Sequence, residues 1–323
     1  MNMPTGATYG TDGDAREEIE REVRCLRVDE RSPRASLDAA RLDRRGDPLA
    51  KSIIVRGVAV AFVDQGEGEP VMLLHCSGSS SAQWRALIDT LGAHYRVIAP
   101  DLFGYGATPL WPGHAPFSLG HEAEIVLALI GMLGEPAHLV GHSYGGVVAL
   151  HVALERPDLL RSLCVIEPVA FHLLDGEPRA EIEAVAQGVE SALSSGDYLN
   201  GFGRFVDYWS GPGAWNKMPE AKRAPMAARL AKVALDFHAI FSEPAQCADF
   251  EDVAVPTLVV QGGRTRLPTQ RICERLADTL PEARSATVPA AGHMLPITHR
   301  DEVNRLIAAH LDTNAVPSEE AKH

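Results

Sequence analysis

The pattern G-x-S-x-G at residues 141–145 lies between two apolar segments, and it limits the possible folds more than any other feature of the chain. Residues 137–140 before it are typical of a buried strand, and residues 147–155 after it are typical of a helix. A sharp turn between strand and helix leaves no room for side chains at its two ends, which explains the glycines there. Such a turn lifts the hydroxyl of Ser143 above the sheet edge and directs the helix N-terminus toward it. The alternative is a glycine-rich turn with an incidental serine.

Strand and helix patterns alternate along most of the chain. Repeated units of this length indicate an α/β protein, with a mostly parallel sheet and helices on both faces. The predicted strands are residues 52–56 and 58–63, which form a hairpin, then 71–74, 95–99, 137–140, 163–166, 257–260 and 285–288. The predicted helices are residues 82–91, 118–133, 147–155, 270–280 and 301–311.

The alternation stops at residues 171–246, which carry helical patterns but no buried strand. One of these patterns includes Met226, Leu230 and Val233, and we expect Pro225 to open that helix. We therefore predict a core of residues 51–170 and 247–312 with a helical insertion at 171–246. The charged residues 1–50 are expected to form a poorly ordered extension and residues 313–323 a frayed polar tail.

Composition excludes several classes of partner. The net charge is −13 without any basic stripe, which argues against nucleic acid and against an anionic membrane. The five scattered cysteines predict free thiols in a reducing compartment, and no histidine pair has metal-ligand spacing. The first 50 residues do not resemble a signal peptide, and no apolar run is long enough to span a membrane. We expect a cytoplasmic protein with a small-molecule substrate, no cofactor and no metal.

With its flanking strand and helix, the G-x-S-x-G segment resembles the nucleophile elbow of the α/β-hydrolase superfamily, and the resemblance extends over residues 51–312. It implies the α/β-hydrolase fold, an eight-stranded, mostly parallel sheet. It also implies a catalytic triad in the order nucleophile, acid, histidine. A helical cap would follow the sixth strand, where residues 171–246 fall. A serine at the elbow argues against the dehalogenases and epoxide hydrolases of this superfamily, which use aspartate.

His293 lies in the segment Ala-Ala-Gly-His-Met after the last predicted strand, which resembles the superfamily's loop for the catalytic histidine. This position predicts that His293 accepts the proton of Ser143 and later delivers it to the leaving group. The alternative is an ordinary surface-loop histidine.

The acid departs from the usual pattern. Many members of the superfamily carry aspartate shortly after the seventh strand, where this chain has Thr265. Glu167 is the candidate replacement, because it ends a buried strand at the edge of the sheet where the active site lies. Some members, including certain haloalkane dehalogenases, place their acid after this sixth strand. The alternative is that Glu167 forms a structural ion pair with an arginine of the insertion.

Acyl transfer also requires two N–H groups that bind the developing oxyanion. The resemblance assigns them to Tyr144, directly after the nucleophile, and to Ser77 in the loop after the third strand. Cys76 occupies the place where the superfamily usually has glycine, and no adjacent base would make it a nucleophile. Asp101 begins a D-x-x-G-x-G loop, which we interpret as structural.

These observations predict a cofactor-free serine hydrolase that acts on an ester of a small or medium apolar molecule through an acyl-enzyme. The aromatic residues of the insertion either line the substrate pocket or form the insertion's own core. A C–C bond hydrolase, a lactonase or a perhydrolase would use the same triad. A ligand-binding protein with a weak hydrolase site is the alternative from another class.

Overall fold

The computed structural model describes residues 50–113 and 116–315. Nearly all of the predicted N-terminal extension, and residues 316–323 of the predicted tail, lie outside these residues. No helix in the described part of the chain is long and apolar enough to cross a membrane.

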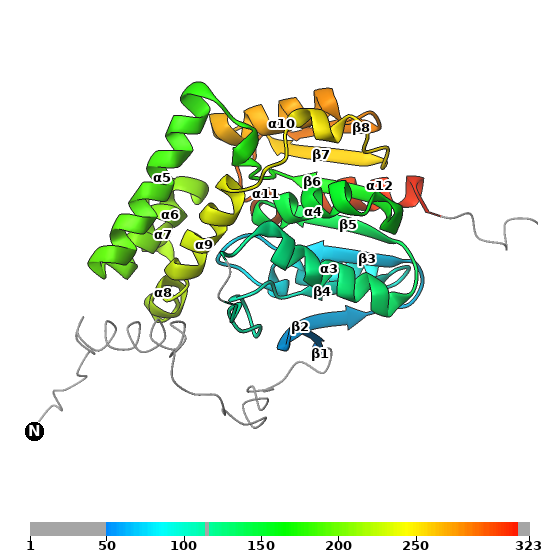
Figure 1. The fold of residues 1–323 in the computed structure, drawn as a ribbon, viewed down its shortest axis with the longest axis horizontal. Helices are drawn as coiled ribbons and strands as arrows, with labels where there is room; N and C mark the ends of the chain where they lie inside the picture. The colour runs from blue at the N-terminus through cyan, green and yellow to red at the C-terminus, as the bar shows by residue number, and fades with distance from the viewer. Residues whose placement is uncertain (1–49, 114–115, 316–323) are drawn as a thin grey trace, which may run out of the picture.

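Eight strands form one sheet in the order β1-β2-β4-β3-β5-β6-β7-β8 (Figure 1). β2 is antiparallel to both of its neighbours, and the other pairs are parallel. This confirms the predicted mostly parallel sheet of eight strands. The strands are β1 (Ala50–Val55), β2 (Val58–Gln65), β3 (Pro70–Leu74), β4 (Arg96–Pro100), β5 (Ala137–His142), β6 (Leu160–Ile166), β7 (Thr257–Gly262) and β8 (Ala283–Val288).

The hairpin between β1 and β2 turns through two residues that both have positive φ, Arg56 at 49° and Gly57 at 82°. Two-residue hairpins favour this backbone conformation because its twist matches that of the strands. The hairpin confirms the predicted turn near Gly57.

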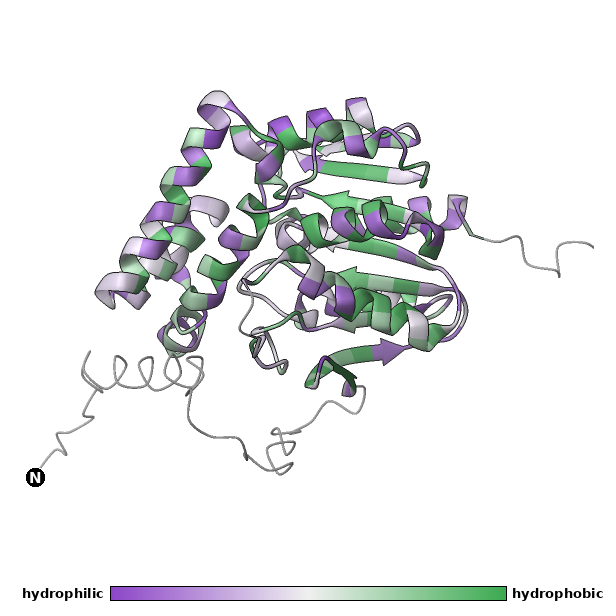
Figure 2. Cartoon of the chain, viewed as in Figure 1, coloured by the Kyte–Doolittle hydropathy of each residue, from purple (hydrophilic) through white to green (hydrophobic). Residues whose placement is uncertain are grey.

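Side chains of the central strands alternate between the two faces of the sheet, and each face has its own hydrophobic core. Met72 and Leu74 of β3 belong to one core, whereas Val71 and Leu73 belong to the other. Figure 2 shows these strands as continuous hydrophobic segments, which is typical of a sheet covered on both faces. The first core includes residues of α3 (Leu119–Leu133), α4 (Tyr144–Glu155) and α10 (Leu267–Thr279), and the second includes residues of α2 (Arg85–Leu91), α11 (Leu295–Thr298) and α12 (Arg300–Thr313).

The chain between β6 and β7 contains helices and no strand. In Figure 1 these helices lie beside the sheet, at the end where the parallel strands finish. Five α-helices make up this insertion: α5 (Gly176–Ser195), α6 (Tyr198–Ser210), α7 (Ala214–Lys217), α8 (Glu220–Ala227) and α9 (Leu230–Phe241). Short 3-10 helices complete the described chain: η2 (Ser81–Trp84), η3 (Pro157–Leu159), η4 (Phe171–Leu173) and η5 (Cys247–Phe250).

Three sequence-based boundaries were wrong. Pro225 lies inside α8 and does not open the following helix. Proline removes a backbone hydrogen bond, and α8 ends two residues later, so the predicted single helix is two. The helix predicted from residue 82 begins as the 3-10 helix η2, and α10 begins at Leu267, with Pro268 in its first turn.

Candidate active site

Ser143 lies at the turn from β5 into α4, in a backbone conformation that is rare for residues with a side chain (φ 56°, ψ −115°). A Cβ atom at Gly141 would lie 2.2 Å from the carbonyl oxygen of Gly145, and one at Gly145 would lie 2.4 Å from that of Leu74. Both distances are far below van der Waals contact, so only glycine fits. The steric explanation of the G-x-S-x-G pattern is therefore confirmed.

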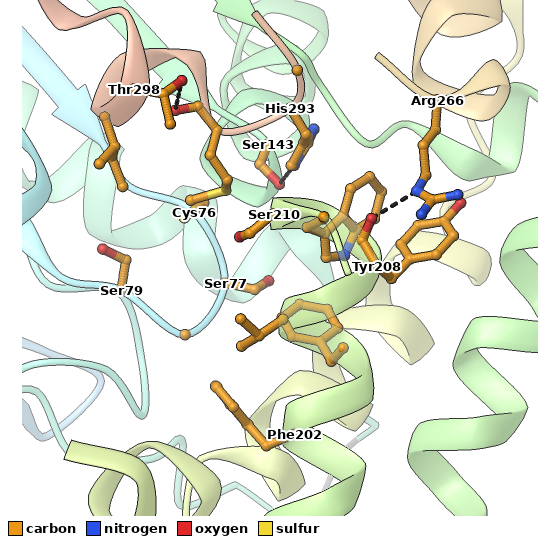
Figure 3. A pocket seen from close by; sticks show the side chains of 18 of the residues that line it. Cys76, Ser77, Ser79, Ser143, Phe202, Tyr208, Ser210, Arg266, His293 and Thr298 are labelled. Carbon is orange, nitrogen blue, oxygen red and sulfur yellow. Dashed lines mark hydrogen bonds between the residues drawn. The ribbon is translucent and has the colours of Figure 1, made fainter. Parts of the chain in front are cut away.

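His293 follows β8, and only 4% of its surface is exposed. Its Nε2 lies 2.9 Å from Ser143 Oγ (Figure 3). The ring of Trp209 packs against the His293 ring, with 4.1 Å between the two centroids. The Nδ1 of His293 lies 3.1 Å from a carboxylate oxygen of Glu167. Because a carboxylate only accepts hydrogen bonds, we assign the proton to Nδ1. Nε2 is then free to accept the hydrogen of the Ser143 hydroxyl.

The carboxylate of Glu167 is fully buried and is held by three donors. His293 Nδ1–H and the Thr265 hydroxyl donate to Oε2, and the backbone N–H of Gly262 donates to Oε1 at 2.6 Å. No arginine of the described residues forms an ion pair with it. The alternative of a structural ion pair with the insertion is therefore wrong for the described residues. Glu167 itself has a positive φ of 48°, which turns the chain sharply at the end of β6.

Thr265 occupies the place where the superfamily usually has aspartate, and it remains part of the site. Its hydroxyl donates to the carboxylate that comes from the neighbouring strand. Sequence reasoning treated Thr265 only as a missing acid. A chemical argument could have identified its role. A buried carboxylate at the end of β6 needs hydrogen-bond donors, and a threonine at the usual position of the acid can supply one.

Two more buried histidines lie near the site and are neutral. Burial lowers the pKa of His142 to about 3 and that of His75 to about 4. His142 Nε2–H donates to the carbonyl of His293, which supports that loop. Burial also raises the pKa of the Cys76 thiol to about 12, so Cys76 carries no thiolate for nucleophilic attack.

Ser77 and Tyr144 both lie beside Ser143. Tyr144 is the first residue of α4, so its N–H has no acceptor within the helix. Ser77 lines the same cavity as Ser143, and its hydroxyl donates to Asp236 of α9 at 2.6 Å. Asp101 lies elsewhere: its carboxylate accepts from the N–H groups of Ser81 and Ala107, which confirms its structural role.

A buried ionic cluster behind the nucleophile escaped sequence reasoning. The ammonium group of Lys232 lies between Glu122 of α3, at 3.0 Å, and Asp236, one turn further along α9. Burial tends to lower the pKa of Lys232, but the two carboxylates outweigh it and the pKa is raised. Burial raises the pKa of Glu122 and of Asp236 more than Lys232 lowers them. A lysine and an aspartate four residues apart in an apolar helix were the available signal.

A cavity of about 820 Å³ opens beside Ser143, between the sheet edge and the insertion (Figure 3). This is the size of a pocket for a small organic molecule. Its wall from the insertion includes apolar residues, namely Phe202, Phe205, Val206, Trp209, Met218 and Met226. Among the described residues, no group of three His, Cys, Asp or Glu side chains could hold a metal ion.

The sheet topology, the strand–helix turn at Ser143 and the adjoining cavity together define a hydrolase scaffold of the α/β type. Residues 71–306 match the alpha/beta hydrolase family, and the chain belongs to that family. Its relatives are hydrolases, and so is this protein.

Two relatives span most of the chain. The pimeloyl-(acyl-carrier protein) methyl ester esterase of Aeromonas hydrophila is 28% identical, and the match covers 75% of this chain and 95% of that protein. The 2-hydroxymuconate semialdehyde hydrolase of Pseudomonas putida is 26% identical, with 80% and 92% covered. A thermophilic esterase from Thermogutta terrifontis has a similar solved structure, with a TM-score of 0.67, 26% identity, and 83% and 99% of the two chains covered.

Proposed function

We propose that the protein is a cofactor-independent serine hydrolase with Ser143 as nucleophile, His293 as base and Glu167 as acid. One observation carries this proposal: an unbroken series of hydrogen bonds runs from Ser143 Oγ through both nitrogens of His293 to the Glu167 carboxylate. In this arrangement His293 takes the serine proton as Ser143 attacks a carbonyl carbon. Glu167 stabilises the imidazolium that forms, and His293 then protonates the leaving group.

The N–H groups of Tyr144 and Ser77 are the proposed donors to the oxyanion of the tetrahedral intermediate. The N-terminus of α4 adds a favourable partial positive charge at the same place. Collapse of the intermediate leaves an acyl group on Ser143. Water, activated by His293, then hydrolyses this acyl-enzyme and restores the free serine.

The proposed substrate is an ester of a small or medium apolar acid, because the cavity beside Ser143 has a mainly apolar wall. Residues 171–246 act in this proposal as a cap over the substrate. The names of two relatives, a methyl ester esterase and a thermophilic esterase, support an ester as the scissile group.

Hydrolysis of a C–C bond next to a ketone is a second candidate. The similarity to 2-hydroxymuconate semialdehyde hydrolase favours it, at nearly the same identity as the esterase. The same serine, base and oxyanion donors would serve. Turnover of a β-diketone in the absence of ester turnover would select this candidate over the esterase.

A fluorophosphonate probe tests the nucleophile directly, because it reacts only with an activated serine. We expect covalent labelling of Ser143 in the wild type and none in Ser143→Ala. The two proteins are then assayed on p-nitrophenyl esters of increasing acyl length. If the wild type is neither labelled nor active, the serine hydrolase proposal is wrong and a ligand-binding role becomes the better explanation.

A further inference from the structure

The charged residues that line the cavity are basic, although the chain as a whole is acidic. The protein has 43 acidic and 30 basic residues other than histidine, yet the cavity wall contains two arginines, Arg264 and Arg266, and no aspartate or glutamate among the described residues. A cationic wall in an acidic protein favours anionic ligands.

The backbone fixes both arginines beside the proposed catalytic residues. They flank Thr265, whose hydroxyl is bound to Glu167. The N–H of Arg264 donates to the carbonyl of Ala291 at 2.8 Å, in the loop that carries His293. Because Thr265 points toward Glu167, its two neighbours are left to line the cavity.

The two guanidinium groups differ in how they are held. Arg264 is exposed and forms no ion pair with any described residue. Arg266 is fixed: its Nε donates to the carbonyl of Tyr208 at 2.6 Å, and its guanidinium lies 4.0 Å from the centre of the Tyr208 ring (Figure 3). Its Nη1 forms an ion pair with Glu181 at 3.7 Å, which is longer than a hydrogen bond, and Glu181 also accepts a hydrogen bond from the Tyr208 hydroxyl at 2.8 Å. One arginine is therefore pre-oriented, and the other is free to close on a ligand.

We propose that Arg264 and Arg266 form a subsite for a carboxylate at the end of the substrate remote from the scissile ester. A guanidinium binds a carboxylate through parallel N–H groups, and the apolar side chains that share the cavity with both arginines and Ser143 suit an alkyl or aryl body. The substrate class is then a half-ester of a dicarboxylic acid. This inference rests on the proposed function, because it assumes that Ser143 is the reacting group.

Two substrates of equal shape test the subsite: a methyl half-ester of a straight-chain dicarboxylic acid, and the same methyl ester with a terminal primary amide. At the best chain length we expect the wild type to have a KM about tenfold lower for the carboxylate substrate than for the amide. The ratio is no larger because Arg264 is exposed, and water weakens its attraction to a carboxylate. The preference should shrink as salt is added, because salt screens exposed charges.

Variants identify the residues responsible. Arg264→Gln should remove most of the preference, and the double variant with Arg266→Gln should remove all of it. Arg271→Gln is the matched control, because Arg271 lies on α10, pairs with Glu274 and does not line the cavity. Equal KM values for the two substrates in the wild type, or a preference that survives in the double variant, would overturn the inference.

Binding of the same pair to Ser143→Ala, measured by calorimetry, separates the two proposals. Tighter binding of the carboxylate without any turnover by the wild type supports the subsite and contradicts the hydrolase mechanism. Turnover of both substrates with equal affinity supports the mechanism and contradicts the subsite.

A second, independent observation concerns the oxyanion donors. Both proposed donor residues also hydrogen-bond through their side chains to the buried ionic cluster. Ser77 Oγ–H donates to Asp236, and the Tyr144 hydroxyl donates to Glu122 at 3.4 Å. Lys232 lies between these two carboxylates.

We infer that Glu122 and Asp236 are positioning residues for the two N–H groups. The charge of Lys232 also offsets carboxylates that would otherwise repel the oxyanion. Ser77→Ala and Tyr144→Phe keep both N–H groups but remove these side-chain bonds. Each should lower kcat about tenfold, with little change in KM, because positioning affects the transition state more than the ground state.

A boronic acid inhibitor, which forms a tetrahedral adduct on serine, gives the decisive readout. Each variant should bind it more weakly, in proportion to the loss of kcat, and Ser77→Thr should restore binding because it keeps the hydroxyl. Loss of thermal stability with unchanged boronate affinity would show that the cluster is merely structural.

Discussion

Replacing Lys232 with methionine should destabilise the protein more than any surface substitution. The Lys232 side chain is 99% buried, and its ammonium group contacts the carboxylates of Glu122 and Asp236 and lies over the rings of Tyr105 and Tyr144. Methionine fills the space of the lysine stem but leaves both carboxylates without their cation. Removing one partner of a buried ion pair costs about 3–5 kcal/mol of unfolding free energy.

The loss should depend on pH, and its sign follows from the carboxylates. Unfolded, Asp236 and Glu122 have their ordinary pKa values of 3.8 and 4.5, and burial raises the pKa of both in the folded protein. Without Lys232 they rise further, so the variant must bind protons as it folds. When folding raises the pKa of a group, its contribution to the free energy of unfolding is complete below the pKa of the unfolded state. That contribution is lost as the pH increases through the pKa of the folded state. The free energy of unfolding of the variant should therefore fall, as the pH rises, by up to about 1.4 kcal/mol per pH unit for each proton that is bound on folding.

Urea unfolding of the wild type, Lys232→Met and the control Lys217→Met, at about pH 5.5 and about pH 8, measures both effects. Lys217 is exposed at the end of α7, so its replacement should change stability by less than about 0.5 kcal/mol. Adding Glu122→Gln and Asp236→Asn to Lys232→Met should recover part of the loss, because no buried carboxylate then remains unpaired. The reasoning fails if Lys232→Met costs less than about 1 kcal/mol and its stability does not change with pH.

Three further predictions concern the site. Glu167→Gln should lower kcat about 10³- to 10⁴-fold in an ester assay, since an amide can neither stabilise the imidazolium nor enforce the His293 tautomer, and nearly full turnover would show that Glu167 is structural. Thr265→Val keeps the shape but removes one donor to the buried Glu167 carboxylate, so kcat should fall about tenfold and urea unfolding should show a loss of about 1–3 kcal/mol. Gly145→Ala should prevent folding or destabilise severely, whereas Gly188→Ala, in open space within α5, should raise the unfolding free energy by about 0.5–1 kcal/mol, as circular dichroism melts would show.

The sheet was predictable because its signals are local. A buried parallel strand is a short apolar run, and a strand–helix unit repeats that signal at regular spacing. The elbow at Ser143 was predictable for the same reason. Its glycines are required by steric contact with atoms only a few residues away or on the adjacent strand. The break after Pro225 was mislocated because apolar spacing alone does not distinguish one helix from two.

Contacts between distant residues could be anticipated only where the fold itself was anticipated. The placement of Glu167 near His293 followed from the rule that parallel strands end at one edge of the sheet. The hydroxyl of Thr265 and the cluster around Lys232 depend on side-chain directions from separate elements, which periodicity does not encode. The catalytic roles of Ser143, His293 and Glu167 stay predictions until the variants are measured.

The hydrogen bonds of the site join residues far apart in the sequence, and this has a consequence for the order of folding. Gly262 and Glu167 are 95 residues apart, and His293 and Ser143 are 150 residues apart. Contacts of such separation form slowly, after large loops have closed. His293 also follows the last strand of the sheet, so a chain still being synthesised holds Ser143 without its histidine. The nascent chain therefore has no complete site until almost all of the described residues have left the ribosome.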